Sequence, residues 1–151
     1  MKNVPKLNLK TITTLFFTAF LLASCSKDTP EPSMGDQHAG TYVLTKVSSG
    51  SSSVSVPSTN PTTGAVITGK IDVTKVADDK ITGTLTLTET DKTGKATNTP
   101  TSLGEVTLKK ATTGEIEGYQ GSTKMASYTN NELSLFTKAS TGETITIIGK
   151  K

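Results

Sequence analysis

The chain has 151 residues, of which 32% are hydrophobic, with sixteen basic and thirteen acidic residues and a formal net charge of +3. Every basic residue is lysine, so the guanidinium groups that pair with phosphate or guanine are missing and nucleic acid is not an expected partner. One cysteine and one histidine exclude an internal disulfide framework and leave too few ligands for a zinc site. We therefore expect neither a metal nor a cofactor.

The beginning of the chain has the layout of a secretory signal peptide. Lys2, Lys6 and Lys10 precede an apolar run of about a dozen residues, which is too short to cross a bilayer. The run ends in Leu-Ala-Ser-Cys at 22–25, which resembles the lipobox of bacterial lipoproteins. The resemblance implies cleavage before Cys25, alkylation of its thiol with diacylglycerol and acylation, for example with palmitate, of the new amino terminus. The alternatives are an ordinary signal peptide whose cysteine lies near the cleavage site by chance, and a buried N-terminal helix.

Removal of residues 1–24 as a lipoprotein signal peptide changes the charge of the chain. Three of the sixteen lysines lie in this leader, which leaves thirteen lysines against thirteen acidic residues. Ser26 fits sorting to an outer membrane, and Lys27-Asp28 loosely resembles the charged export signals of some surface-exposed lipoproteins. We expect a lipid-anchored protein of the bacterial cell envelope, in the outer membrane, on either its periplasmic or its surface face.

Residues 25–39 are expected to form a lipidated flexible tether. They are polar, contain proline and have no hydrophobic period. His38, the single histidine, lies at the end of this segment and is expected to be solvated. Because Ser-His-Asp chemistry needs a histidine held inside the fold, we expect no enzymatic activity.

The remaining segment, 40–151, is one domain by length, and its hydrophobic period is two. Apolar residues alternate with threonine along 64–76 and 80–90, which is typical of antiparallel strands with one buried face. The same alternation recurs in shorter form toward the end of the chain. Eight strands are predicted, near residues 41–47, 64–76, 80–90, 103–110, 114–120, 123–129, 132–138 and 143–149.

Two connections between these strands are long. Residues 48–63 and 91–102 are low in complexity and poor in apolar side chains, which predicts flexible surface loops, with a lid over a barrel mouth as the alternative. The other connections are short and contain the Gly, Asn and Asp of tight hairpins. Sequential hairpins favour an all-β, eight-stranded antiparallel up-and-down β-barrel over a two-sheet sandwich, and closure removes exposed strand edges.

Gly40-Thr41-Tyr42 opens the first predicted strand and is followed by a long first loop. Lipocalins begin in a similar way with Gly-x-Trp, so the domain 40–151 resembles a lipocalin-like domain of the calycin type. In this chain Tyr42 replaces the tryptophan of the family, and no arginine is available to close the bottom of the barrel.

An eight-stranded barrel is either filled by side chains or holds one small ligand. We expect a non-catalytic barrel that binds a small apolar ligand, with Gly69, Gly83 and Gly118 leaving room on the inner face. The residues expected to line the site are Tyr42, Leu44, Ile67, Ile71, Leu85, Leu87, Val106 and Leu108. The alternative is a structural or adhesive cell-surface module with a solid core that acts through protein partners.

The expected partners follow from these two hypotheses. They are the lipid bilayer through acylated Cys25, a small hydrophobic ligand and a protein of the cell envelope, with the domain itself a monomer. Phe136 and Ile148 point to the outer face of neighbouring strands and form either incidental packing or a partner surface.

Overall fold

The computed structural model of the protein describes residues 30–151. The predicted signal peptide, the predicted lipobox and Cys25 lie outside the described residues. The described part contains one short helix, α2 (Met34–His38), and ten strands. The strands are β1 (Gly40–Ser49), β2 (Ser52–Ser55), β3 (Ser58–Thr59), β4 (Val66–Ala77), β5 (Lys80–Thr90), β6 (Ala96–Lys110), β7 (Ile116–Gln120), β8 (Thr123–Thr129), β9 (Glu132–Lys138) and β10 (Thr144–Lys150).

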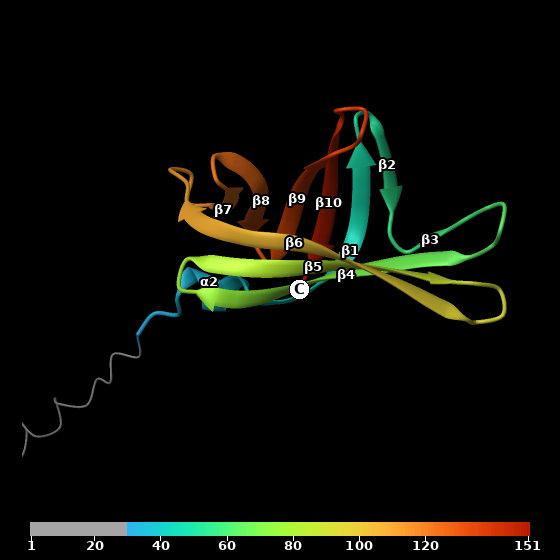
Figure 1. Ribbon diagram of the computed structural model, residues 1–151, viewed down its shortest axis with the longest axis horizontal. Helices are drawn as coiled ribbons and strands as arrows, with labels where there is room; N and C mark the ends of the chain where they lie inside the picture. Colours follow the sequence, from blue (N-terminus) through green and yellow to red (C-terminus); the bar gives the residue numbers. More distant parts are fainter. Residues whose placement is uncertain (1–29) are drawn as a thin grey trace, which may run out of the picture. The chain divides into compact units, whose positions relative to one another are not determined.

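Eight of these strands close into an antiparallel up-and-down β-barrel. Strands β4 to β10 pair in chain order, and β1 closes the barrel because it pairs with β10 on one side and with β4 on the other. In Figure 1, β4, β5 and β6 cross the direction of β1 and β7 to β10 at a large angle, as tilted strands of a closed barrel do. The predicted all-β barrel, the architecture of a lipocalin-like domain, is confirmed.

The period of two places apolar side chains inside the barrel. On β4, Ile71 and Val73 are buried while Lys70 and Thr74 are exposed, and on β6 the residues Val106 and Leu108 are buried in the same way. Full burial of such a side chain contributes roughly 1.5 to 3 kcal/mol. The buried core consists of Tyr42, Leu44, Ile71, Val73, Ile81, Val106, Leu108, Ala126, Tyr128 and Leu133.

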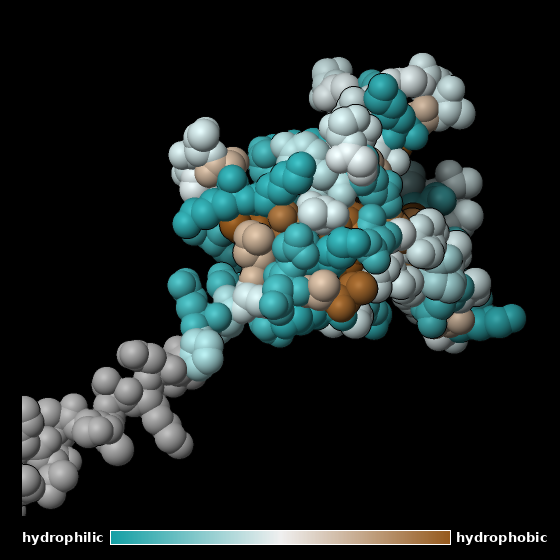
Figure 2. All heavy atoms as spheres, turned by 60° about the vertical axis from the view of Figure 1, so that its left-hand side comes forward, coloured by the Kyte–Doolittle hydropathy of each residue, from teal (hydrophilic) through white to brown (hydrophobic). Residues whose placement is uncertain are grey.

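Large apolar side chains that remain exposed are scattered over the described surface. They lie on β1, β2, β4 and β5 and include Val43, Val54 and Leu87. Figure 2 shows a largely polar face on which apolar residues occupy small separate areas. Phe136 and Ile148, expected on the outer face, are both partly buried.

The prediction of a flexible loop at 48–63 is wrong. Strand β1 continues to Ser49, β2 folds back on it as a hairpin through Gly50 at φ +54°, and β3 pairs with the start of β4. Between β2 and β3, the Val56 N–H donates to the Thr45 carbonyl oxygen at 2.9 Å, and the Val56 side chain packs against the core. Backbone pairing orders this segment. Because its side chains are mostly polar, the sequence shows no hydrophobic alternation that would have predicted these strands.

The prediction of a flexible loop at 91–102 is also wrong. Strand β6 begins at Ala96, and its first seven residues pair with β5 although their side chains are exposed. What remains is a tight turn in which Asp91 Oδ1 accepts the N–H of Thr93 at 2.8 Å and of Lys95 at 3.0 Å. The paired ribbon extends away from the barrel in Figure 1 instead of covering its mouth.

The end of the expected tether is folded onto the barrel. The Asp36 N–H donates to Ser33 Oγ at 3.2 Å at the start of α2, and Asp36 Oδ2 accepts from Lys75 Nζ at 2.7 Å. Gly35 is buried, and its N–H donates to the Asp78 carbonyl oxygen at 2.8 Å. Helix α2 therefore packs against the β4–β5 hairpin at one end of the barrel.

The described ladders contain four β-bulges, including one at Thr45 of β1 and one at Val76 of β4, and two of the four lie toward the other end. In the β5–β6 ladder the extra residue is Leu103, and in the β7–β8 ladder it is Met125. A bulge bends its strand and re-aims the side chain of the extra residue. Next to Met125 the β8–β9 ladder ends with the pair Ala126 and Leu135, although both strands continue toward that end. The barrel wall therefore has a gap between β8 and β9.

Candidate ligand-binding site

A hollow of about 270 Å³, here called the inner hollow, lies on the inner face of the barrel at the end where the β8–β9 ladder stops. Leu103 and Met125, the extra residues of two of the bulges, both line it. The complete lining is Leu85, Thr101, Ser102, Leu103, Val106, Met125, Leu135, Phe136, Thr137 and Ile147. Since ligand pockets usually measure about 300 to 1,000 Å³, the inner hollow alone suits a small and mainly apolar ligand.

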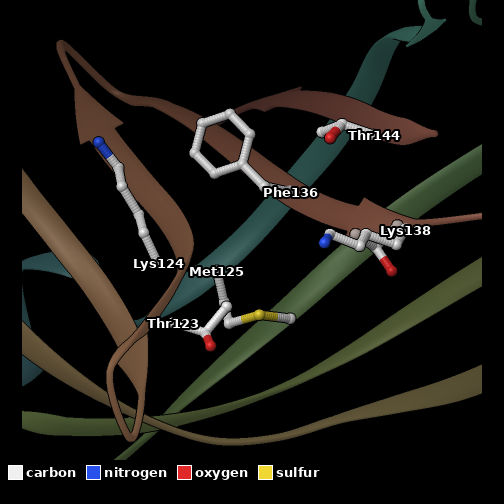
Figure 3. A pocket seen from close by; sticks show the side chains of 7 residues that line it. Thr123, Lys124, Met125, Phe136, Lys138 and Thr144 are labelled. Atoms are coloured by element: carbon white, nitrogen blue, oxygen red, sulfur yellow. The ribbon is translucent and has the colours of Figure 1, made fainter. Parts of the chain in front are cut away.

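A second hollow of about 450 Å³, here called the outer groove, lies at the gap between β8 and β9. Its lining is Thr123, Lys124, Met125, Phe136, Thr137, Lys138 and Thr144. Met125, Phe136 and Thr137 line both spaces, so these three side chains form the boundary between them. Figure 3 shows the Phe136 ring between the two strands, with Lys124 and Met125 extending from β8.

The outer groove carries two ammonium groups and no carboxylate in its lining. Lys124 Nζ donates to Glu117 Oε1 and lies 5.7 Å from the centroid of the Phe136 ring. The hydrogen bond from Lys124 lowers the pKa of Glu117 and in turn raises the pKa of Lys124, so both stay charged at neutral pH. Lys138 forms no ion pair within residues 30–151.

The structure divides the eight lining residues predicted from the sequence into three groups. Leu85 and Val106 line the inner hollow. Leu44, Ile71 and Leu108 are at most 2% exposed and fill the barrel with solid core.

The other three predicted residues lie away from the inner hollow. Tyr42 is 1% exposed and lies at the α2 end of the barrel. Ile67 is partly buried and Leu87 is 39% exposed. Both belong to the stretch where β4 and β5 leave the barrel for the exposed ribbon, which explains why inward alternation does not bring them to the site.

The expected room above the glycines is filled by neighbouring side chains. A methyl of Leu103 lies 3.1 Å from the position that a Cβ on Gly83 would take, and a methyl of Val106 lies 2.6 Å from that on Gly118. Leucine methyls close the space above Gly69 in the same manner. The space above these glycines is therefore occupied by the side chains of neighbouring residues and is not available to a ligand.

Sequence reasoning assigned only two of the ten lining residues and missed the other eight, which are Thr101, Ser102, the bulged Leu103 and Met125, Leu135, Phe136, Thr137 and Ile147. Leu103 precedes Val106 by three positions, which breaks the period of two and is a signal for a bulge. Met125 directly precedes the buried Ala126 and breaks the period in the same way. Leu135 and Ile147 lay on the predicted inner face but were not assigned to the site.

A groove of about 210 Å³ lies at the opposite end, beside α2. There the rings of His38 and Tyr128 lie 4.5 Å apart, and His38 Nε2 is buried without a hydrogen-bond partner in the described part of the chain. The Tyr42 hydroxyl donates to the His38 carbonyl oxygen at 2.9 Å, and Lys151 Nζ lies 5.4 Å from the Tyr42 ring centroid. The expectation of a solvated His38 is wrong, because α2 holds it against the barrel.

Burial controls ionisation at this end. The pKa of His38 is lowered by burial and, to a smaller degree, by the charge of Lys151. Burial raises the pKa of Tyr42 to about 12 and also raises the pKa of Tyr128. These three side chains are therefore neutral at pH 7 and pack as an aromatic cluster.

The described residues contain neither a metal-binding cluster nor a helix that could span a membrane. Among residues 30–151, His, Cys, Asp and Glu side chains form no group of three that could hold a metal ion. The helix in this part of the chain lacks the length and apolar content needed to span a membrane. No protein-family model, curated protein or solved structure matches the chain. The class of the domain, an all-β up-and-down barrel, therefore rests on its strand order and closure.

Proposed function

We propose that the protein is a membrane-anchored lipoprotein whose lipocalin-like barrel binds one small apolar ligand without catalysis. The observation that carries this proposal is the inner hollow, in which side chains of five strands surround a space within an otherwise packed barrel. Burial of apolar ligand surface in such a space contributes roughly 25 cal/mol per Å². An apolar hollow offers water few hydrogen-bond partners, so a ligand would displace little bound water.

The membrane anchor in this proposal rests on the sequence at 22–25 and on the basic and apolar leader before it. One acyl chain binds a membrane only marginally, whereas two or three chains hold a protein there. Acylation of Cys25 would attach the chain to the outer membrane, with Ser26 favouring that destination, and would place the barrel beside the bilayer.

Ligand binding is tested with an apolar fluorescent probe and a chain that begins at Ser26. The compact unit spans Pro32–Lys151 and contains every contact of the barrel core, so this chain keeps the fold. We expect binding of about one probe per barrel, weakened roughly tenfold or more by Leu85→Phe, which places a larger, rigid ring in the inner hollow. The matched control is Leu87→Phe, two residues along β5 and 39% exposed, which should bind as the wild type does. Absence of probe binding, or equal binding by both variants, contradicts the proposal.

The anchor is tested by Cys25→Ala in the full chain. The wild type should pellet with membranes and show the added mass of diacylglycerol and acyl chains at its amino terminus. The variant should move to the soluble fraction or retain its leader. Unchanged pelleting together with a wild type that carries no lipid mass would contradict the anchor.

A structural or adhesive module is the second candidate, and the solid part of the barrel favours it. Leu44, Ile71, Leu108 and Leu133 are at most 2% exposed, so much of the interior is already filled. The two candidates differ in the probe experiment, because a module that acts through protein partners should bind no apolar probe.

A further inference from the structure

We infer that the gap between β8 and β9 is the entrance to the inner hollow and that the ligand it admits is amphipathic, with an apolar chain and an anionic head. This inference rests on the proposed ligand binding and names the class of ligand. The chain of the ligand would occupy the inner hollow, and its head would remain in the outer groove.

The gap is a consequence of how β8 pairs. The extra residue Met125 lies in the β7–β8 ladder immediately before the last β8–β9 pair, Ala126 with Leu135. Beyond that point β8 continues to pair with β7, and β9 continues to pair with β10 as far as Lys138. The two hairpins therefore diverge, and the opening is part of the backbone structure.

Side chains, not backbone, separate the two spaces at this gap. Met125, Phe136 and Thr137 are common to both linings, and Phe136 lies between the strands in Figure 3. Methionine is an adaptable side chain with three rotatable bonds, and the Phe136 ring packs at the gap with its residue only partly buried. Rotation of these two side chains would join the outer groove to the inner hollow without breaking a ladder hydrogen bond.

The charge of the outer groove favours an anionic head. Lys124 and Lys138 both line it, and Glu117, which accepts from Lys124, lies on β7 outside the lining. Lys124 pairs with Glu117 and also lies within the field of Glu115, whereas Lys138 forms no ion pair within the described residues, so Lys138 is the cation of the lining that is available to a ligand. The hydroxyl of Thr144 and those of two other lining threonines supply further hydrogen-bond donors.

The groove at the α2 end does not offer the same combination. Its lining includes Glu132, two asparagines and the Tyr42–Tyr128 cluster, and below it lie core side chains such as Leu133, which is 0% exposed. An apolar chain would find no space beyond it. The combination of positive rim and apolar interior is thus found at the β8–β9 gap.

The head group is tested with three ligands that share one apolar chain: decanoate, decanol and decyltrimethylammonium. Their affinities for the chain that begins at Ser26 are measured by calorimetry, at low salt because screening weakens exposed charges. We expect decanoate to bind about fivefold more tightly than decanol, and the cation to bind least. In Lys138→Gln this preference for decanoate should fall to less than about twofold. Lys110→Gln removes the same charge from an exposed site on β6 and should leave the preference unchanged.

The entrance is tested with Phe136→Ala. Removal of the ring from the gap should speed both association and dissociation of decanoate, followed by stopped-flow displacement of a fluorescent probe, by similar factors. Leu87→Ala on the exposed ribbon is the control and should leave both rates unchanged.

Each outcome bears on a separate claim. If none of the three ligands binds, both this inference and the proposed function are overturned. Equal binding of decanoate and decanol, preference for the cation, or an unchanged preference in Lys138→Gln overturns the anionic head alone. Unchanged rates in Phe136→Ala overturn the entrance and leave ligand binding in the barrel intact.

Discussion

The two ends of the barrel are built from the same strands and differ in how completely they are packed. On β9, Leu133 is 0% exposed in the solid core, whereas Leu135, two residues further along the same face, lines the inner hollow. The boundary between the two regions also crosses the β4–β5 ladder, where Leu85 borders the hollow and its direct partner Ile71 is fully buried. Alternation thus decides which side chains face inward, and the local pairing of strands decides how much space they meet.

The end of the β8–β9 ladder, together with the two bulges beside it, explains the difference. Around Leu133 the β8–β9 and β9–β10 ladders are both intact. Around Leu135 the β8–β9 ladder ends, and the bulges at Leu103 and Met125 bend their strands. Side chains of ordinary size fill the closely spaced end and leave a hollow at the end where the wall diverges.

The largest effect on the free energy of unfolding is expected from alanine substitutions of the two leucines of β9. Leu133→Ala should lower the free energy of unfolding by about 2 to 5 kcal/mol, because the cavity it leaves is enclosed by packed side chains. Leu135→Ala should cost less, about 1 to 2 kcal/mol, since its side chain already faces a hollow and makes fewer contacts. Urea unfolding of the chain that begins at Ser26 measures both. Equal losses would show that the hollow is filled in solution by rearranged side chains.

A smaller contrast is expected from two glycines. A Cβ on Gly118 would lie 2.6 Å from a Val106 methyl and 3.1 Å from the Ala126 Cβ, so Gly118→Ala should destabilise by about 1 to 3 kcal/mol. A Cβ on Gly83 would lie 3.1 Å from a methyl of Leu103, which borders the inner hollow and can move into it. Gly83→Ala should therefore cost less than about 1 kcal/mol in thermal or urea unfolding. The reverse order would mean that the Leu103 side chain is more tightly held than that of Val106.

The smallest effect concerns pH and the α2 end. Burial lowers the pKa of His38 below its ordinary 6.5, so the unfolded chain binds a proton more readily than the folded one. The stability conferred by neutral His38 is therefore complete above about pH 6.5 and is lost as the pH falls through its folded pKa. Thermal unfolding between about pH 7.5 and pH 5.5 should show this decline, and His38→Gln should flatten it. An unchanged slope in His38→Gln would assign the decline to other groups.

Much of the fold could be predicted from the sequence, because it depends on local signals. The alternation of threonine with apolar residues along β4 and β5 predicted strands whose observed ends differ by at most two residues. Asn130 and Asn131 have φ values of 49° and 65°, as a tight hairpin turn requires, and the sequence placed a turn there. The ribbon formed by 96–102 was missed, since its exposed side chains carry no alternation and only backbone pairing orders it.

The candidate site was only partly predictable. The sequence placed Leu85 and Val106 on the inner face, and both line the inner hollow. It could not distinguish them from Leu44 or Leu108, which have the same alternation and are fully buried, because packing density depends on residues far away in the chain.

By itself, the sequence determined that the chain has a basic and apolar N-terminal segment, which ends at the single cysteine at 25, and after it a domain of antiparallel strands joined by tight turns. These properties follow from periodicity and turn chemistry over a few neighbouring residues. The inner hollow, the β8–β9 gap and the approach of Lys124 to Phe136 were decided only by the tertiary structure. These features depend on the register of several ladders at once. An extra residue such as Met125 shifts that register. The local hydrophobic pattern changes too little to show where the barrel wall opens.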